Sequence, residues 1–90
     1  MKTWKRESFY NNSYYLKIIF NLGNKTMSGS IFVSEDNKMA LFTFKSLGIQ
    51  NKKIEFTNDD EMKAEAEKYL VKRLNERINE LNQVKEMMEN

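Results

Sequence analysis

Residues 57–90 read TNDDEMKAEAEKYLVKRLNERINELNQVKEMMEN, and the fold follows from this stretch. Apolar residues recur in it every three or four positions without an intervening glycine or proline, which predicts one long helix over residues 58–89. Asn58 followed by Glu61 matches the spacing of a helix capping box, and the acidic first turn suits the positive end of the helix dipole. The predicted apolar stripe consists of Met62, Ala66, Tyr69, Leu70, Leu74, Ile78, Leu81 and Met88.

In residues 1–56 apolar residues tend to recur at every second position, which predicts strands. Turn-forming residues at 11–13, 23–24 and 35–37 separate strands at about 3–10, 14–20, 26–34 and 38–45, with a short last strand at 53–56 and a bulge at Gly29. The chain is therefore predicted to be a single α+β domain over residues 1–90, an antiparallel four- to five-stranded β-meander followed by one long C-terminal helix packed on one sheet face. The core face is predicted to hold Tyr14, Leu16, Ile18, Phe20, Ala40, Phe42, Phe44, Ile54 and Phe56.

The predicted helix is longer than its sheet. Its length is roughly 45 Å at 1.5 Å per residue, whereas a strand of seven residues covers about 23 Å. The last three turns therefore need another cover, unless they fray in solution. From Val71 onward, apolar residues recur alternately three and four positions apart, with Lys85 as the one polar exception. This spacing predicts a parallel or antiparallel helix pair in a homodimer. The residues predicted to form the dimer helix are Leu74, Ile78, Leu81 and Met88.

The second face of the predicted sheet mixes apolar with cationic residues. A single helix cannot cover both faces of a sheet, so this face is predicted to be an interaction surface rather than an ordinary solvated one. Its members are Tyr15, Lys17, Ile19, Met39, Leu41, Thr43 and Lys45.

Nucleic acid is one candidate partner. Residues 1–53 hold nine Lys and Arg against three acids, whereas residues 54–90 hold six against ten. On the basic part, Tyr15 with Trp4 or Tyr10 would stack on bases. The sequence has no aromatic-glycine motif of the RRM type, no GXXG loop and no arginine-rich run. The cations predicted to neutralise phosphates are Lys5, Arg6, Lys17, Lys45, Lys52 and Lys53.

A protein is the other candidate partner, and the favoured one. Acids dominate the polar side of the helix, where Asp59–Lys63 and Lys63–Glu67 are predicted i,i+4 ion pairs. Such an acidic row can mimic nucleic acid in a basic groove, although surface acids usually only solvate a helix. We expect a stoichiometric regulator or inhibitor, by analogy with small phage-encoded inhibitors such as anti-CRISPR proteins. The predicted partner-binding residues are Tyr15, Lys17, Met39, Leu41, Lys45, Lys53, Ile78, Glu80 and Leu81.

The sequence argues against an enzyme. It contains no cysteine and no histidine, which removes thiolate chemistry and the commonest general base. The carboxylates Asp59, Asp60 and Glu61 are explained by the start of the helix and lack the spacing of a calcium loop. No cofactor, metal or membrane partner is expected, and the chain is predicted to act in the cytoplasm, which would be the host cytoplasm for a phage protein.

Overall fold

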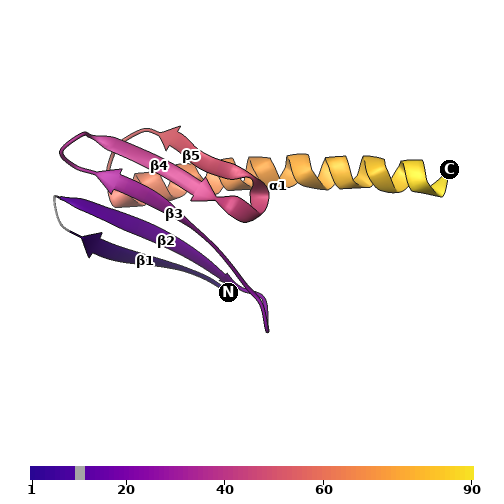
Figure 1. Cartoon of the computed structure of the whole chain (residues 1–90), viewed down its shortest axis with the longest axis horizontal. Coiled ribbons are helices and arrows are strands. Elements are labelled where there is room, and N and C mark those ends of the chain that lie inside the picture. The colour runs from indigo at the N-terminus through magenta and orange to yellow at the C-terminus, as the bar shows by residue number, and fades with distance from the viewer. Residues whose placement is uncertain (10–11) are drawn as a thin grey trace.

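The computed structural model describes residues 1–9 and 12–90 and contains a five-stranded antiparallel sheet followed by one long helix (Figure 1). The strands lie side by side in chain order, and a short 3-10 helix connects the last two. The predicted α+β meander with a C-terminal helix is confirmed. The elements are β1 (Lys2–Phe9), β2 (Ser13–Asn21), β3 (Thr26–Ser34), β4 (Met39–Phe44), η1 (Lys45–Leu47), β5 (Ile49–Ile54) and α1 (Asp59–Glu89).

The connection from β2 to β3 is the predicted hairpin. Gly23 has a φ of 78°, and the backbone N–H of Leu22 donates to the carbonyl of Lys25 at 2.8 Å. A positive φ at the first central residue is typical of a tight hairpin turn, because glycine has no Cβ to clash there. Tyr10 and Asn11, which were predicted to end a strand and begin a turn, lie outside the described residues.

The predicted bulge at Gly29 is wrong. Gly29 lies opposite Ile18 in an uninterrupted β2–β3 ladder, and the register shift occurs instead between β4 and β5, at Phe42 and Phe44. A Cβ on Gly29 would lie 2.4 Å from Cδ2 of Phe44. The glycine is therefore needed for close packing within the sheet rather than for an extra residue in the strand.

The last strand also differs from the prediction, because β5 covers Ile49–Ile54 instead of residues 53–56. Gly48 has a φ of 70° and turns the chain directly from η1 into the strand. Only the two end residues of β5 are buried, and the four between them are exposed. The strand therefore lacks the apolar alternation by which sequence patterns identify strands.

The core lies between the sheet and α1, on the predicted face. Seven of the nine predicted residues are buried, and the remaining two, Phe20 and Phe56, are partly buried. β3 adds Ile31 and Val33, and β5 adds Ile49. From α1 the buried residues are Met62, Ala66 and Leu70.

The start of α1 is fixed by its cap and by β1. The Asn58 side chain accepts a hydrogen bond from the backbone N–H of Glu61 at 2.9 Å, as the capping pattern predicted. The predicted pairs of Lys63 with Asp59 and Glu67 do not form among the described residues, because both acids bind β1 instead. Asp59 accepts from Arg6, and Glu67 accepts from Lys2 and from the Trp4 indole. The hydrogen bond from Lys2 holds the pKa of Glu67 below its ordinary value of 4.5.

The ionisation of Tyr14 makes the stability of the fold depend on pH in the alkaline range. Its hydroxyl donates to Asp59 at 2.6 Å, and burial together with this carboxylate raises the pKa of Tyr14 to about 12 from 10.0. Because the folded-state pKa is the higher one, this contribution to stability is present below pH 10 and is lost as pH rises from 10 towards 12. We expect Tyr14→Phe to lower the free energy of unfolding at neutral pH by about 1–2 kcal/mol and to flatten its decline at alkaline pH.

Urea denaturation at several pH values between neutral and alkaline measures both effects. Tyr15→Phe is the matched control, since it removes a hydroxyl from the neighbouring residue, whose ring lies among Phe9 and Phe32 instead. An alkaline decline as steep in Tyr14→Phe as in the wild type would contradict the assignment.

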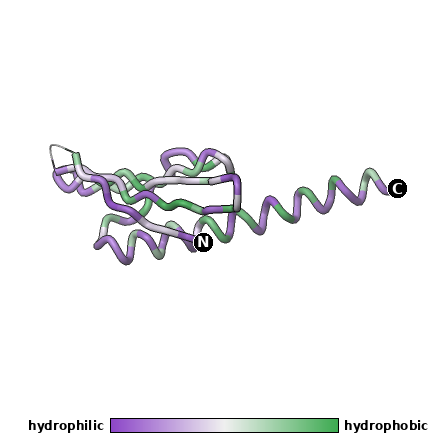
Figure 2. The backbone as a smooth tube through the Cα atoms, turned by 90° about the horizontal axis from the view of Figure 1, so that it is seen from below, coloured by the Kyte–Doolittle hydropathy of each residue, from purple (hydrophilic) through white to green (hydrophobic). Residues whose placement is uncertain are grey.

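The C-terminal part of α1 extends past the sheet (Figure 2). Among the described residues, the last hydrogen bond from α1 to an earlier element comes from Arg73, whose Nε donates to the carbonyl of Leu47 at 3.1 Å, and every later residue is exposed. The Cα radius of gyration is 15.5 Å, against about 12 Å for a compact chain of this length. The prediction that the helix is too long for its sheet is confirmed.

Candidate functional site

The sheet surface opposite α1, hereafter the outer face, brings several of the predicted partner-binding residues together. Tyr15, Phe32, Leu41 and Lys53 form one cross-strand row from β2 to β5. Met39 precedes Leu41 by two residues on β4 and therefore lies on the same face. Whether these residues bind a partner stays a prediction, but the structure places them on one continuous surface.

The centre of the outer face is aromatic. The ring centroids of Phe9, Tyr15 and Phe32 lie 5.3–5.9 Å apart, and Phe9 is 39% exposed. Sequence reasoning did not place Phe9 and Phe32 on this face. Phe32 stands between two other apolar residues, so alternation could not assign it to a face. The apolar residues of β1, Trp4 and Phe9, do not alternate, so no sequence pattern assigned Phe9 to a face either. We call Phe9, Tyr15, Phe32, Met39 and Leu41 the apolar strip.

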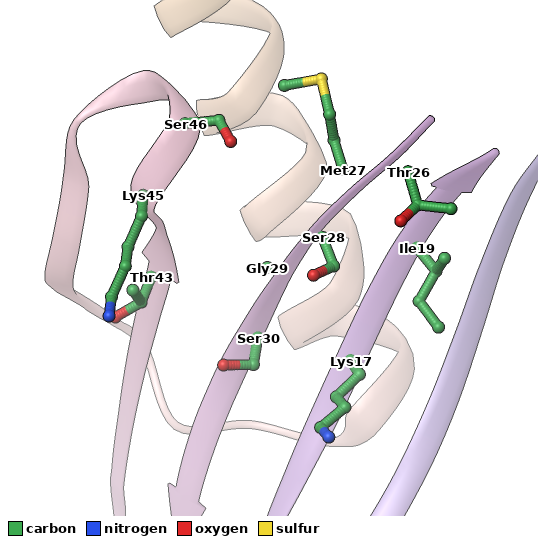
Figure 3. A pocket seen from close by; sticks show the side chains of 10 residues that line it. All are labelled: Lys17, Ile19, Thr26, Met27, Ser28, Gly29, Ser30, Thr43, Lys45 and Ser46. Carbon is green, nitrogen blue, oxygen red and sulfur yellow. The ribbon is translucent and has the colours of Figure 1, made fainter. Parts of the chain in front are cut away.

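Beside the apolar strip lies an open hollow of about 530 Å³ (Figure 3). Lys17 on β2 and Lys45 at the start of η1 stand on either side of Ser30 and Thr43. The small strand residues leave this space open between the two lysines. Ser30 and Thr43 also line a second hollow, which reaches Tyr15 and Phe32. The two lysines are therefore continuous with the apolar strip, and we call this region the lysine hollow.

The outer face carries more cations than acids. Lys5 lies opposite Lys17 on neighbouring strands, and Lys17 forms an ion pair with Glu7 at 2.9 Å. Lys45 and Lys53 are exposed and have no acidic partner within the described residues. The border of the apolar strip is thus basic, with one of its lysines partly neutralised.

Three residues predicted for nucleic-acid contact lie on the helix side of the sheet instead. Trp4 donates its indole N–H to Glu67 at 2.8 Å, and Arg6 lies 3.8 Å above the Tyr14 ring while it binds Asp59. Lys52 lies 5.1 Å from the ring centroid of Tyr69. Each of these side chains holds α1 to the sheet, so the outer face has fewer stacking and phosphate-binding groups than the sequence predicted.

The predicted helix residues form a second, separate surface. We call residues 71–89 the projecting segment, since every residue in it except Arg73 is exposed. Ile78 is 52% exposed and Leu81 60%, and Glu80 lies 3.9 Å from Arg77. The C-terminal part of α1, to which these residues belong, continues past the end of the sheet (Figure 1), and α1 covers the face of the sheet opposite the outer face. The structure therefore does not join the two groups of predicted residues into one site.

Comparisons of the chain with protein-family models, with curated proteins and with solved structures found no match. Within residues 1–9 and 12–90, no helix has the length and the apolar composition needed to cross a membrane. In the same residues, histidines, cysteines and carboxylates do not gather in any group of three or more that could hold a metal ion.

Proposed function

We propose that this protein is a non-enzymatic regulator or inhibitor that binds a protein partner stoichiometrically through its outer face. The observation that carries the proposal is the apolar strip with its basic border. Protein interfaces typically have an aromatic and apolar centre within a polar rim, and aromatic anchors supply much of the binding energy. Tyr15 and Phe32 are half-buried before any partner binds, so their rings are already held in position.

The charge of the border defines the kind of partner. Lys5, Lys17 and Lys45 lie along one side of the strip and Lys53 lies at its β5 end, while Glu7 lies opposite Tyr15 on β1. Opposite charges around an interface raise the association rate and select the partner's orientation. The partner surface that fits is an apolar patch with an acidic border, and we expect the encounter to take place in the cytoplasm.

A substitution that introduces one charge into the apolar strip tests whether the partner binds there. Leu41→Asp is expected to weaken partner capture by at least about tenfold, because a half-buried apolar contact becomes a desolvated carboxylate. The immobilised protein is exposed to a lysate of its source cell, and retained proteins are quantified by mass spectrometry. Gln83→Asp, on the projecting segment, is the control with the same charge change. Retention by wild type, Leu41→Asp and Gln83→Asp alike would reject the outer face as the binding surface.

A second candidate function is single-stranded nucleic-acid binding, which is favoured by the position of Lys17 and Lys45 beside the rings of Tyr15 and Phe32. Bases would stack on the rings while phosphates occupy the lysine hollow. Binding to labelled oligonucleotides would then weaken between about 50 and 200 mM salt, with a log-log slope of roughly −0.7 per phosphate contact. A double Lys17→Ala, Lys45→Ala variant would lose this binding, whereas a protein partner held mainly by the apolar strip would be retained.

A further inference from the structure

The projecting segment exposes an apolar seam. Val71, Leu74, Ile78, Leu81 and Met88 are between 40% and 83% exposed and recur at alternating intervals of three and four, with Lys85 at the one polar position. Such spacing places the side chains along one side of a helix, as in a coiled coil. Green apolar positions continue in Figure 2 as far as the C-terminal end, beyond the sheet. In proteins most of the stability of a helix comes from packing of its apolar face, so a cover for the seam would stabilise the segment.

The charges along the segment indicate what covers the seam. Residues 72–79 contain Lys72, Arg73 and Arg77 against one acid, for a net charge of +2. Residues 80–89 contain three acids against Lys85, for a net charge of −2. Two copies in antiparallel orientation place the basic half of each segment beside the acidic half of the other, whereas parallel copies place like charges together. The segment is therefore complementary to an antiparallel second copy of itself.

The seam also sets a register. With a two-fold axis between residues 79 and 80, Ile78 faces Leu81 of the second copy, and Val71 faces Met88. Leu74 then faces Lys85, whose aliphatic stem can cover the leucine while its amine reaches solvent. All apolar seam residues gain a facing side chain in this arrangement.

In this register the C-terminal end of the second copy's helix lies beside an apolar pocket of the first copy. Its volume is about 170 Å³, and it opens where α1 leaves the sheet, between the β2–β3 hairpin, η1 and the helix. A cavity of about 150 Å³ accepts a benzene ring, so one methionine side chain fits. Methionine is unbranched and fills irregular apolar spaces well. The lining residues are Phe20, Leu22, Met27, Phe44, Leu47, Leu70 and Leu74.

We propose that two copies of this chain pair in antiparallel orientation through their projecting segments, and that each copy places Met88 in the apolar pocket at the base of the other's helix. This pairing leaves the outer face of both copies free for the proposed partner, and it does not depend on that function.

Molecular mass over a range of protein concentrations tests the pairing. The wild-type chain is expected to be a dimer, and Leu81→Asp is expected to raise its dissociation constant by about 100-fold or more, since the charge enters the seam twice. Gln83→Asp carries the same charge on the opposite side of the helix and is expected to leave the dimer intact. Circular dichroism establishes that each variant is folded. A wild-type monomer at every concentration, or equal effects of the two variants, would overturn the proposal.

Cysteine cross-linking tests the orientation, because the natural chain contains no cysteine. In the proposed dimer the two copies of residue 88 lie about 25 Å apart, whereas residue 88 of one copy is beside residue 71 of the other. A mixture of Val71→Cys and Met88→Cys chains is expected to form disulfide-linked dimers, and Met88→Cys alone is not. The pair Leu74→Cys and Lys85→Cys tests the same register with Met88 in place. Efficient cross-linking of Met88→Cys or Lys85→Cys to itself would overturn the antiparallel orientation.

A substitution in the pocket tests whether Met88 of the second copy occupies it. Leu22 lines the pocket and is 53% exposed, so Leu22→Glu is expected to leave the fold intact and to weaken the dimer by about tenfold or more. Asn24→Glu places the same charge in the same turn, outside the pocket, and serves as the control. Unchanged dimerisation of Leu22→Glu would overturn the placement of Met88.

Discussion

Replacing Phe42 by alanine is expected to lower the free energy of unfolding by about 3–5 kcal/mol. Phe42 is fully buried on β4, opposite Ile31, and its ring centroid lies 6.4 Å from that of Phe44. The central position of this side chain leaves its neighbours little freedom to collapse into the space. Because domains of this kind are stable by about 5–15 kcal/mol, the variant is expected to be close to unfolding.

The neighbouring residue provides the control for Phe42→Ala. Leu41 points to the outer face and is half-buried, so Leu41→Ala is expected to cost about 1 kcal/mol. Urea denaturation followed by circular dichroism measures both values under the same conditions. Equal losses in the two variants would contradict the assignment of the two sheet faces, on which the candidate site depends.

Replacing Gly29 by alanine is expected to cost about 3 kcal/mol, at the upper end for overpacking. The added Cβ would lie 2.4 Å from Cδ2 of Phe44 and 2.7 Å from the carbonyl oxygen of Thr43. The ring can rotate away at some cost, but the carbonyl belongs to the backbone of β4 in the middle of the sheet. The strand itself must therefore shift.

The mechanism of the Gly29 effect is tested by a double variant. Phe44→Leu removes the edge of the ring, so Gly29→Ala is expected to cost less in that background than in the wild type. Ser30→Ala, one residue along the same strand, is expected to change stability by no more than about 0.5 kcal/mol. A Gly29→Ala variant as stable as Ser30→Ala would show that β3 and β4 are not packed as closely as described.

Local patterns were sufficient for the helix, for the first four strands and for the core face. The helix begins where Asn58 can accept the hydrogen bond of Glu61, and strands occur where apolar residues alternate. These features depend on residues within a few positions of one another, so sequence reasoning could find them. Strand β5 was misplaced because its interior is exposed and polar, and its pairing depends on β4 rather than on its own pattern.

The candidate site was predicted only in part, because its composition depends on which face each strand residue takes. Tyr15, Lys17 and Leu41 follow a clear alternation and lie on the outer face as expected. Phe32 belongs to a continuous apolar run that fits either face, and the β2–β3 register decided between them.

The sequence by itself determined the meander, the capped helix and the excess length of that helix, since these follow from local periodicity and from the rise per residue. Only the tertiary structure decided which cations and aromatic residues share a surface. Trp4 and Arg6 turn to α1 because Glu67 and Asp59, distant in sequence, lie there to accept their hydrogen bonds. Adjacent strand residues point to opposite faces, so a shift of one residue in register would have exchanged these groups with those of the outer face.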